Sequence, residues 1–262
     1  MQIVIIGAGR LATSLAPALH EAGHEIVQVY SRTMASASAL AERVGAEAVA
    51  QVEQVTQEAD VYVFAVSDTA LPTLAEQLSC GREKAVLLHT AGSMPMSVFP
   101  DSAAHRGVLY PMQTFSKQRQ VDFSKVTIFI EGSDPLAVDT ARALASSVSN
   151  KVMMLDSEGR RSLHLAAVFA CNFANHCYEL SAEILAAHGL PFEVMLPLVD
   201  ETAAKVHELS PLQAQTGPAV RNDKAVMQRQ LDLLNEMNMQ RLAHIYNALS
   251  DSIHETSITP RQ

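Results

Sequence analysis

The chain has 262 residues, enough for one large domain or two modest ones with a hydrophobic core. Its formal net charge is −9 and no stretch is rich in lysine or arginine, which argues against nucleic acid as a partner. Without a signal-like start or an apolar run near the roughly 18 residues that a membrane helix needs, we expect a cytoplasmic protein. Its three cysteines, an odd number without C-x-x-C spacing, are typical of reduced thiols and argue against disulfides.

The first predicted elements are a strand, a glycine turn and a helix. Residues 2–6 (QIVII) form a β-branched run typical of a buried parallel strand, and GAGRLA follows at once. Gly7 allows the tight turn, Gly9 lets a pyrophosphate approach the backbone, and Ala12 lets the helix pack on the strand. The residues predicted to bind a dinucleotide here are Gly7, Ala8, Gly9, Arg10 and Leu11.

The next predicted strand, EIVQVY at 25–30, is followed by Ser31, Arg32 and Thr33. Chains that bind NAD place a carboxylate about 20 residues after the glycine turn, where it holds the ribose 2′-hydroxyl, whereas an arginine there accommodates the 2′-phosphate of NADP. The three residues therefore predict a 2′-phosphate site and NADP as the cofactor. The alternative is that Arg32 is a solvated loop residue.

Strands and helices continue to alternate for about 150 residues. The predicted strands are 46–50, 60–66, 84–89, 107–111, 125–132 and 151–156, and the predicted helices between them include 34–43, 69–79 and 135–148. This alternation predicts an α/β fold with a doubly wound, mostly parallel Rossmann sheet. We place this NADP-binding domain at residues 1–156.

Only helical patterns follow, at 157–188, 192–209 and 223–254. They predict an all-helical domain at residues 157–262 for substrate binding and dimerisation. The first run is apolar nearly all round, so it is expected to be buried, either within its domain or against a second subunit. The run from 223 adds further apolar surface, and we predict a homodimer through the helical domains.

The sequence resembles the superfamily of pyrroline-5-carboxylate reductase, 6-phosphogluconate and 3-hydroxyisobutyrate dehydrogenases, and deazaflavin-dependent NADP oxidoreductases. The pieces LLHTAGS (87–93), LYPMQTFS (109–116) and TGPAVRND (216–223) are similar to a bacterial family of Rossmann-like proteins with a helical domain of unknown function. This resemblance spans essentially the whole chain. It implies an NADP-dependent oxidoreductase with a 6-phosphogluconate dehydrogenase-like helical domain, and a homodimer.

Ligands of an open α/β sheet bind outside the carboxyl ends of its strands. Val66 and Ser67 are therefore expected to contact the cofactor, and Ala91 and Gly92 to leave room for its nicotinamide ring. Pyrroline-carboxylate reductases have a small A-G turn and a Met-Pro-Asn at similar places, where this chain has Pro-Met-Gln. The predicted substrate-binding residues are Gln113, Thr114 and Arg221, the last of these either a substrate clamp or part of a surface or interface ion pair.

Hydride reduction of a carbonyl or imine requires a proton or hydrogen-bond donor at the heteroatom. The candidates are His89 at a strand end and His164 early in the apolar helix, with Asn172 on the same helical face as His164. The polar pair either holds substrate in a cleft between the domains or makes structural hydrogen bonds. The hydroxyacid dehydrogenases have a lysine shortly before the corresponding asparagine, and this chain has Phe169 and Val168 there.

The sequence thus predicts an NADP(H)-dependent oxidoreductase that transfers a hydride to or from a small carbonyl, imine or deazaflavin-like substrate. The alternative is a protein that senses NADP(H) without turnover, having lost the acid/base residue. No metal site is expected, because Gly23 interrupts the helix in HEAGH (20–24), the one zinc-like motif.

Overall fold

A computed structural model of the protein describes residues 1–116 and 118–259. The chain forms two compact units, one from Met1 to Cys171 and one that begins at Asn172. Within the described residues, no helix combines the length and the apolar character needed to cross a membrane.

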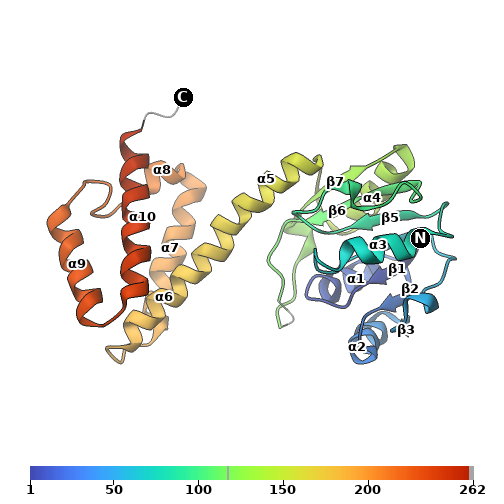
Figure 1. The fold of residues 1–262 in the computed structure, drawn as a ribbon, viewed down its shortest axis with the longest axis horizontal. Coiled ribbons are helices and arrows are strands. Elements are labelled where there is room, and N and C mark those ends of the chain that lie inside the picture. The colour runs from blue at the N-terminus through green and yellow to red at the C-terminus, as the bar shows by residue number, and fades with distance from the viewer. Residues whose placement is uncertain (117, 260–262) are drawn as a thin grey trace. The chain divides into compact units, whose positions relative to one another are not determined.

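The first unit is built on one eight-stranded sheet (Figure 1). Its strands are β1 (Gln2–Ile6), β2 (Glu25–Tyr30), β3 (Glu47–Val49), β4 (Val61–Phe64), β5 (Val86–His89), β6 (His105–Pro111), β7 (Thr127–Gly132) and β8 (Lys151–Met154). They lie in the order β3-β2-β1-β4-β5-β6-β7-β8, and all neighbours are parallel except β6 and β7. The predicted doubly wound, mostly parallel sheet is confirmed, and the direction of connection reverses at β1.

Two hydrophobic layers enclose this sheet. The helices of the first unit are α1 (Ala12–Glu21), α2 (Met34–Val44), α3 (Leu71–Ser79), α4 (Pro135–Val148) and α5 (Ser157–Ala167). Alternate side chains of β1 point to opposite faces, so Ile3 and Ile5 pack with α1, α2 and α4, whereas Val4 and Ile6 pack with α3. Both faces are therefore buried, which explains the continuous apolar runs of the strands.

The first unit extends fifteen residues beyond the predicted boundary at 156, because α5 is held by the sheet. Arg160 is fully buried in this helix, and its guanidinium pairs with Glu131 of β7 at 2.5 Å. Leu163, one turn further on, packs against a cluster formed by Val108, Tyr110 and Phe129. An apolar helix pattern alone does not reveal such a side-chain anchor.

The second unit contains more helices than the three predicted runs. They are α6 (Ala174–Ala186), α7 (Leu196–Glu208), α8 (Pro211–Ala214), α9 (Lys224–Glu236) and α10 (Gln240–Ile258). The predicted continuous run 223–254 was wrong, because Asn238 adopts a left-handed conformation with φ of 56° and separates α9 from α10. The run 157–188 was also wrong as a single α-helix, since residues Val168–Phe173 form a π-helical segment between α5 and α6.

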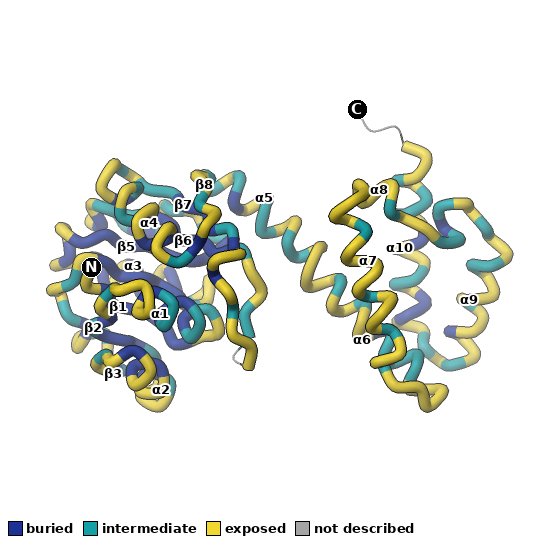
Figure 2. Tube along the Cα trace, turned by 180° about the vertical axis from the view of Figure 1, so that it is seen from behind, coloured by how far each residue is buried: buried dark blue, intermediate teal, exposed yellow. Residues whose placement is uncertain are grey.

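The second unit buries few apolar side chains of its own. Its core consists of Leu180, Leu234, Leu242 and Ala243. Figure 2 shows much of its trace as exposed or intermediate, whereas buried residues follow the strands of the first unit. Of the two alternatives for the run from 157, burial within its domain was wrong, since Leu165 is 60% exposed, and burial against a second subunit stays a prediction.

Candidate active site

A large pocket of about 670 Å³ lies at the carboxyl edge of the sheet, entirely within the first unit. Its lining comes from the segments that follow β1, β2, β4, β5 and β6, together with one side chain from α5. The residues on which the argument rests are Gly7, Gly9, Arg10, Ser31, Arg32, Thr33, Ser36, Val66, Ser67, Asp68, Ala91, Gly92, Tyr110, Gln113 and His164. The pocket includes the point where the strand order reverses, the usual ligand site of such a sheet.

The glycine turn after β1 fits the backbone of a dinucleotide. Gly7 has φ of +115°, and a Cβ there would lie 2.3 Å from the carbonyl oxygen of Ala65. Its N–H donates to the Tyr30 carbonyl at 2.7 Å, which ties the turn to β2. Only glycine meets both constraints, so the turn brings bare backbone and the N terminus of α1 to the pocket, an arrangement suited to a pyrophosphate.

The segment after β2 brings together the predicted 2′-phosphate residues. Ser31, Arg32 and Thr33 all line the pocket. Ser36 joins them, and its hydroxyl accepts a hydrogen bond from that of Thr33 at 2.9 Å. Ser36 was missed in the sequence, although its place in the first turn of α2 would have been a usable signal, because helix N-termini favour phosphate.

The loops after β4 and β5 border the same pocket. Val66, Ser67 and Ala91, which are predicted to lie beside the cofactor, line this pocket. The Ser93 hydroxyl donates to the carboxylate of Asp68, which connects the two loops. Gly92 also lines the pocket, and its nearest neighbour is the ring of His164, whereas room for the nicotinamide ring was expected. A Cβ on Gly92 would lie 2.4 Å from Nδ1 of His164, so the space that this glycine leaves is taken by the histidine ring.

The end of the pocket beside Gly92 contains a pair of polar aromatic side chains. The hydroxyl of Tyr110 and Nδ1 of His164 are 3.0 Å apart, and the two rings meet edge to face with centroids 6.0 Å apart. Tyr110 is only 7% exposed, and burial is the largest cause that raises the pKa of its phenol. Tyr110 was missed in the sequence, where it belongs to an apolar strand pattern.

The predicted catalytic residue His89 does not reach the pocket. Its side chain is fully buried and packs against Phe99 on the α3 face of the sheet, with ring centroids 5.7 Å apart. Nδ1 accepts a hydrogen bond from the N–H of Ala91 at 3.2 Å. Burial, reinforced by the Arg160 charge, lowers its pKa to about 3, so His89 is neutral and supports the loop that carries Ala91 and Gly92.

Arg160 anchors the helix that delivers His164. Besides Glu131, its guanidinium donates to the carbonyl of Met94 at 2.6 Å and to the Ser157 hydroxyl at 3.2 Å. The same hydroxyl donates to Glu131 and accepts from the N–H of Met96. His164 follows Arg160 by four residues and therefore lies one turn further along the same side of α5.

Of the three predicted substrate-binding residues, one lines the pocket and two do not. Gln113 lines the pocket, but its side-chain oxygen accepts from the N–H of Thr114 at 2.8 Å, and Thr114 itself is exposed and outside the lining. Arg221 belongs to the second unit, in the turn before α9, where Asp223 caps the helix by accepting from the N–H of Val226. The role of Arg221 in substrate binding stays a prediction.

Asn172 is the first residue of the second unit and is exposed. Its predicted alignment with His164 rests on the spacing of a continuous α-helix. That spacing does not apply across the π-helical segment Val168–Phe173, since a π-helix bonds i to i+5 and turns less per residue. The shared face with His164 and the role of Asn172 both stay predictions.

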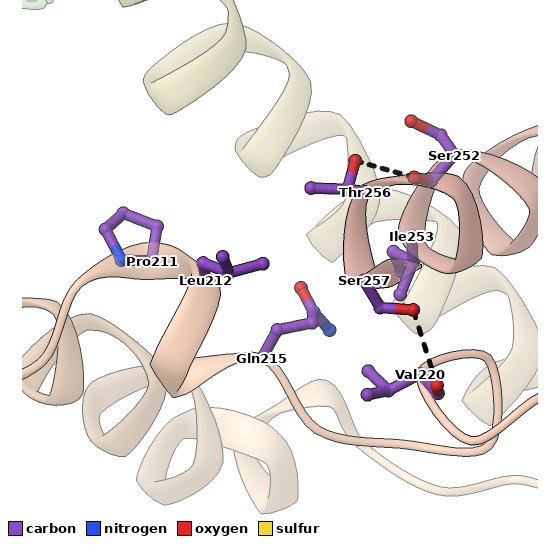
Figure 3. Close-up of a pocket in the computed structure, with 8 residues that line it drawn as sticks. All are labelled: Pro211, Leu212, Gln215, Val220, Ser252, Ile253, Thr256 and Ser257. Atoms are coloured by element: carbon purple, nitrogen blue, oxygen red, sulfur yellow. Dashed lines mark hydrogen bonds between the residues drawn. The ribbon is translucent and has the colours of Figure 1, made fainter. Parts of the chain in front are cut away.

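A second, smaller cavity of about 190 Å³ lies in the second unit (Figure 3). Its eight lining residues include no charged side chain. The hydroxyls of Thr256 and Ser257 donate to the carbonyls of Ser252 and Val220. With no charged side chain and two of its three hydroxyl groups donating to carbonyls, the cavity offers little for catalysis, and the large pocket is the candidate active site.

Comparisons with known proteins identify the class to which the chain belongs. Residues 2–92 match the family model described as "NADP oxidoreductase coenzyme F420-dependent", and residues 126–253 match a domain of unknown function, DUF2520. No curated protein matches the sequence. The fold and the pocket thus define an oxidoreductase of the Rossmann class.

Three solved structures are similar over almost their whole length. A "putative NADP oxidoreductase" from Bacteroides fragilis is 51% identical over 97% of this chain and 98% of its own, with a TM-score of 0.92. An imine reductase from Myxococcus stipitatus in complex with NADP+ is 18% identical over 97% and 93% of the two chains, with a TM-score of 0.72. A reductive aminase from Aspergillus terreus in complex with NADPH and ethyl-5-oxohexanoate is 16% identical over 94% and 92%, with a TM-score of 0.69.

The chain belongs to the family of NADP oxidoreductases in which a coenzyme F420-dependent-type NADP domain precedes a DUF2520 domain. The two matches at 18% and 16% identity show the fold. NADP as the cofactor is confirmed, as is the predicted class of oxidoreductase.

Proposed function

We propose that the protein is an NADPH-dependent reductase of a small molecule with a C=N or C=O bond. The observation that carries this proposal is that one pocket combines a dinucleotide cradle at one end with the Tyr110–His164 pair at the other. The imine reductase and the reductive aminase that share the fold support the substrate class.

Different residues of the first unit bind different parts of the cofactor and substrate along the pocket. The turn at Gly7 and Gly9 holds the pyrophosphate, and Arg32 with its hydroxyl neighbours holds the 2′-phosphate. Bound NADPH supplies a hydride. His164 donates a hydrogen bond to the substrate heteroatom, which stabilises the negative charge that grows there, and solvent supplies the proton that the heteroatom finally takes up.

The test is a screen for NADPH oxidation with cyclic imines, ketones offered with and without amines, and an oxidised deazaflavin. We expect turnover with a member of the first two groups, and His164→Ala should lower kcat by about 10²- to 10³-fold, the usual effect of removing one such donor. His20→Ala is the matched control, because His20 is exposed at the end of α1.

Tight NADPH binding without turnover across this panel would instead support the alternative, a protein that senses NADP(H). Oxidation of NADPH by the deazaflavin alone would move the proposal to that acceptor, which the description of the matched family model also names. Neither result would change the assignment of the nucleotide end of the pocket.

We also propose that the protein works as a homodimer through its helical unit. Large apolar side chains remain exposed along and beside α7, among them Leu190, Val194, Leu196, Leu198 and Val206. A surface of this kind on a unit with a small core is typical of a subunit interface. Light scattering at micromolar concentration should give about twice the 28.3 kDa chain mass, and a monomeric mass would exclude the dimer. The cytoplasmic location stays a prediction from the sequence.

A further inference from the structure

The Tyr110–His164 contact has a direction that decides which histidine nitrogen is available to the substrate. A neutral imidazole carries its proton on one nitrogen and accepts with the other, and the hydrogen bond at one nitrogen selects the tautomer. The contact at 3.0 Å joins the phenol hydroxyl to Nδ1. If the hydroxyl donates, the proton of His164 is on Nε2; if Nδ1 donates, Nε2 is an acceptor.

We propose that Tyr110 is a positioning residue whose hydroxyl donates to Nδ1 of His164 and so holds the ring in the tautomer with its proton on Nε2, the donor offered to the substrate. A buried hydroxyl proton needs an acceptor, and Nδ1 is within hydrogen-bond distance of this one. This inference rests on the proposed function for its catalytic consequence, but the tautomer itself is a property of the free protein.

Packing fixes both partners of the contact. The ring of Tyr110 lies in a cluster with Val108 and Phe129, and the two aromatic centroids are 6.5 Å apart. On the other side, Gly92 leaves room for the imidazole at a distance that no Cβ would allow. Neither ring can therefore move far without disturbing its neighbours. Packing fixes the position of the imidazole, and the hydrogen bond selects its tautomer.

The surrounding charges agree with a donating phenol. Burial is the largest cause that raises the pKa of Tyr110, the Arg160 charge opposes it, and the thiolate form of Cys171 adds to it. The net direction is upward, so the phenol keeps its proton at neutral pH. Arg160 itself is neutralised by Glu131 at 2.5 Å.

The reaction then balances without a charged histidine. The hydride brings two electrons to the carbon of the double bond, and the electron pair of that bond moves to nitrogen or oxygen. The Nε2–H of His164 donates a hydrogen bond to this atom, and one proton from solvent completes the amine or alcohol. Tyr110 does not touch the substrate in this scheme, because its own proton is directed to Nδ1.

The experiment is ¹⁵N NMR of the histidine-labelled full chain without nucleotide, at about pH 8.5, where an ordinary imidazole is neutral. The His164 signals are assigned from their loss in His164→Gln. We expect a protonated Nε2 and an unprotonated Nδ1 in the wild-type chain, and a mixture of tautomers in Tyr110→Phe. A proton on Nδ1 in the wild-type chain would overturn the proposal, whether or not the variant folds.

Tyr62→Phe is the matched control, since Tyr62 is also buried and donates to a carbonyl, that of Thr56 at 2.8 Å. It should leave the His164 signals unchanged. With a substrate in hand, Tyr110→Phe should lower kcat by about 10- to 100-fold, while KM and NADPH affinity stay near wild type. An unchanged kcat would refute the positioning role, and the NMR result stands even if no substrate is found.

Discussion

Arg32→Ala is expected to weaken NADPH binding by about 10- to 100-fold and to leave NADH binding nearly unchanged. Arg32 lines the pocket with Ser31, Thr33 and Ser36, and a guanidinium there makes charge-assisted hydrogen bonds to the 2′-phosphate that NADH lacks. Each such bond contributes about 1.5 to 3 kcal/mol. Calorimetric titration of both nucleotides measures the effect, and the wild-type protein should prefer NADPH at least about tenfold.

Arg43→Ala is the control for charge. Arg43 lies in the same helix as Ser36, but its guanidinium donates to the carbonyl of Thr13 at 2.9 Å and is not part of the pocket lining. It should leave the ratio of the two affinities as it is. An equal loss of both nucleotides in Arg32→Ala would mean that Arg32 holds a part of the cofactor that they share.

Arg160→Met is expected to lower the free energy of unfolding by about 3 to 5 kcal/mol. The change leaves the Glu131 carboxylate, whose side chain is 15% exposed, without its partner in an interior that penalises an unpaired charge. It also removes the hydrogen bond to the carbonyl of Met94. Urea denaturation followed by far-ultraviolet circular dichroism provides the measurement.

Arg161→Met is the matched control, because the neighbouring Arg161 is exposed and should change stability by less than about 0.5 kcal/mol. The double variant Arg160→Met with Glu131→Gln should recover part of the loss, since a neutral amide is less costly to bury than a carboxylate. Equal effects of Arg160→Met and Arg161→Met would show that the ion pair contributes nothing to stability.

The residues that the sequence predicted at the nucleotide end do line the pocket, because local backbone geometry and charge select them, and their contacts with the cofactor stay a prediction. Gly7 is required by a positive φ and a close carbonyl, and Arg32 follows a strand whose end is fixed by the sheet. The positive φ is local to the turn and leaves a recognisable glycine pattern in the sequence, although the crowding carbonyl belongs to the distant Ala65. The fold of the first unit could also be predicted from local patterns, because each of its strands and helices has its own hydrophobic periodicity.

The chemical end was predicted less well, because it depends on contacts between distant segments. His89 stands at a strand end, yet the alternation of β5 directs its ring toward Phe99 and the α3 face. Tyr110 and His164 are 54 positions apart, and the anchor of α5 is an ion pair between Arg160 and Glu131. In the second unit, a single left-handed residue, Asn238, divided a helix that looked continuous.

A single substitution at Gly92 could separate an active enzyme from a protein that only binds the nucleotide. One methyl group at this position would lie 2.4 Å from Nδ1 of His164 and would push the ring away from Tyr110. The glycine turn and Arg32 lie on other loops and would keep the dinucleotide. A lineage of this family could therefore lose catalysis and retain its cofactor through one small substitution, so relatives with a side chain at this position are the natural place to look for proteins that only report the NADP pool.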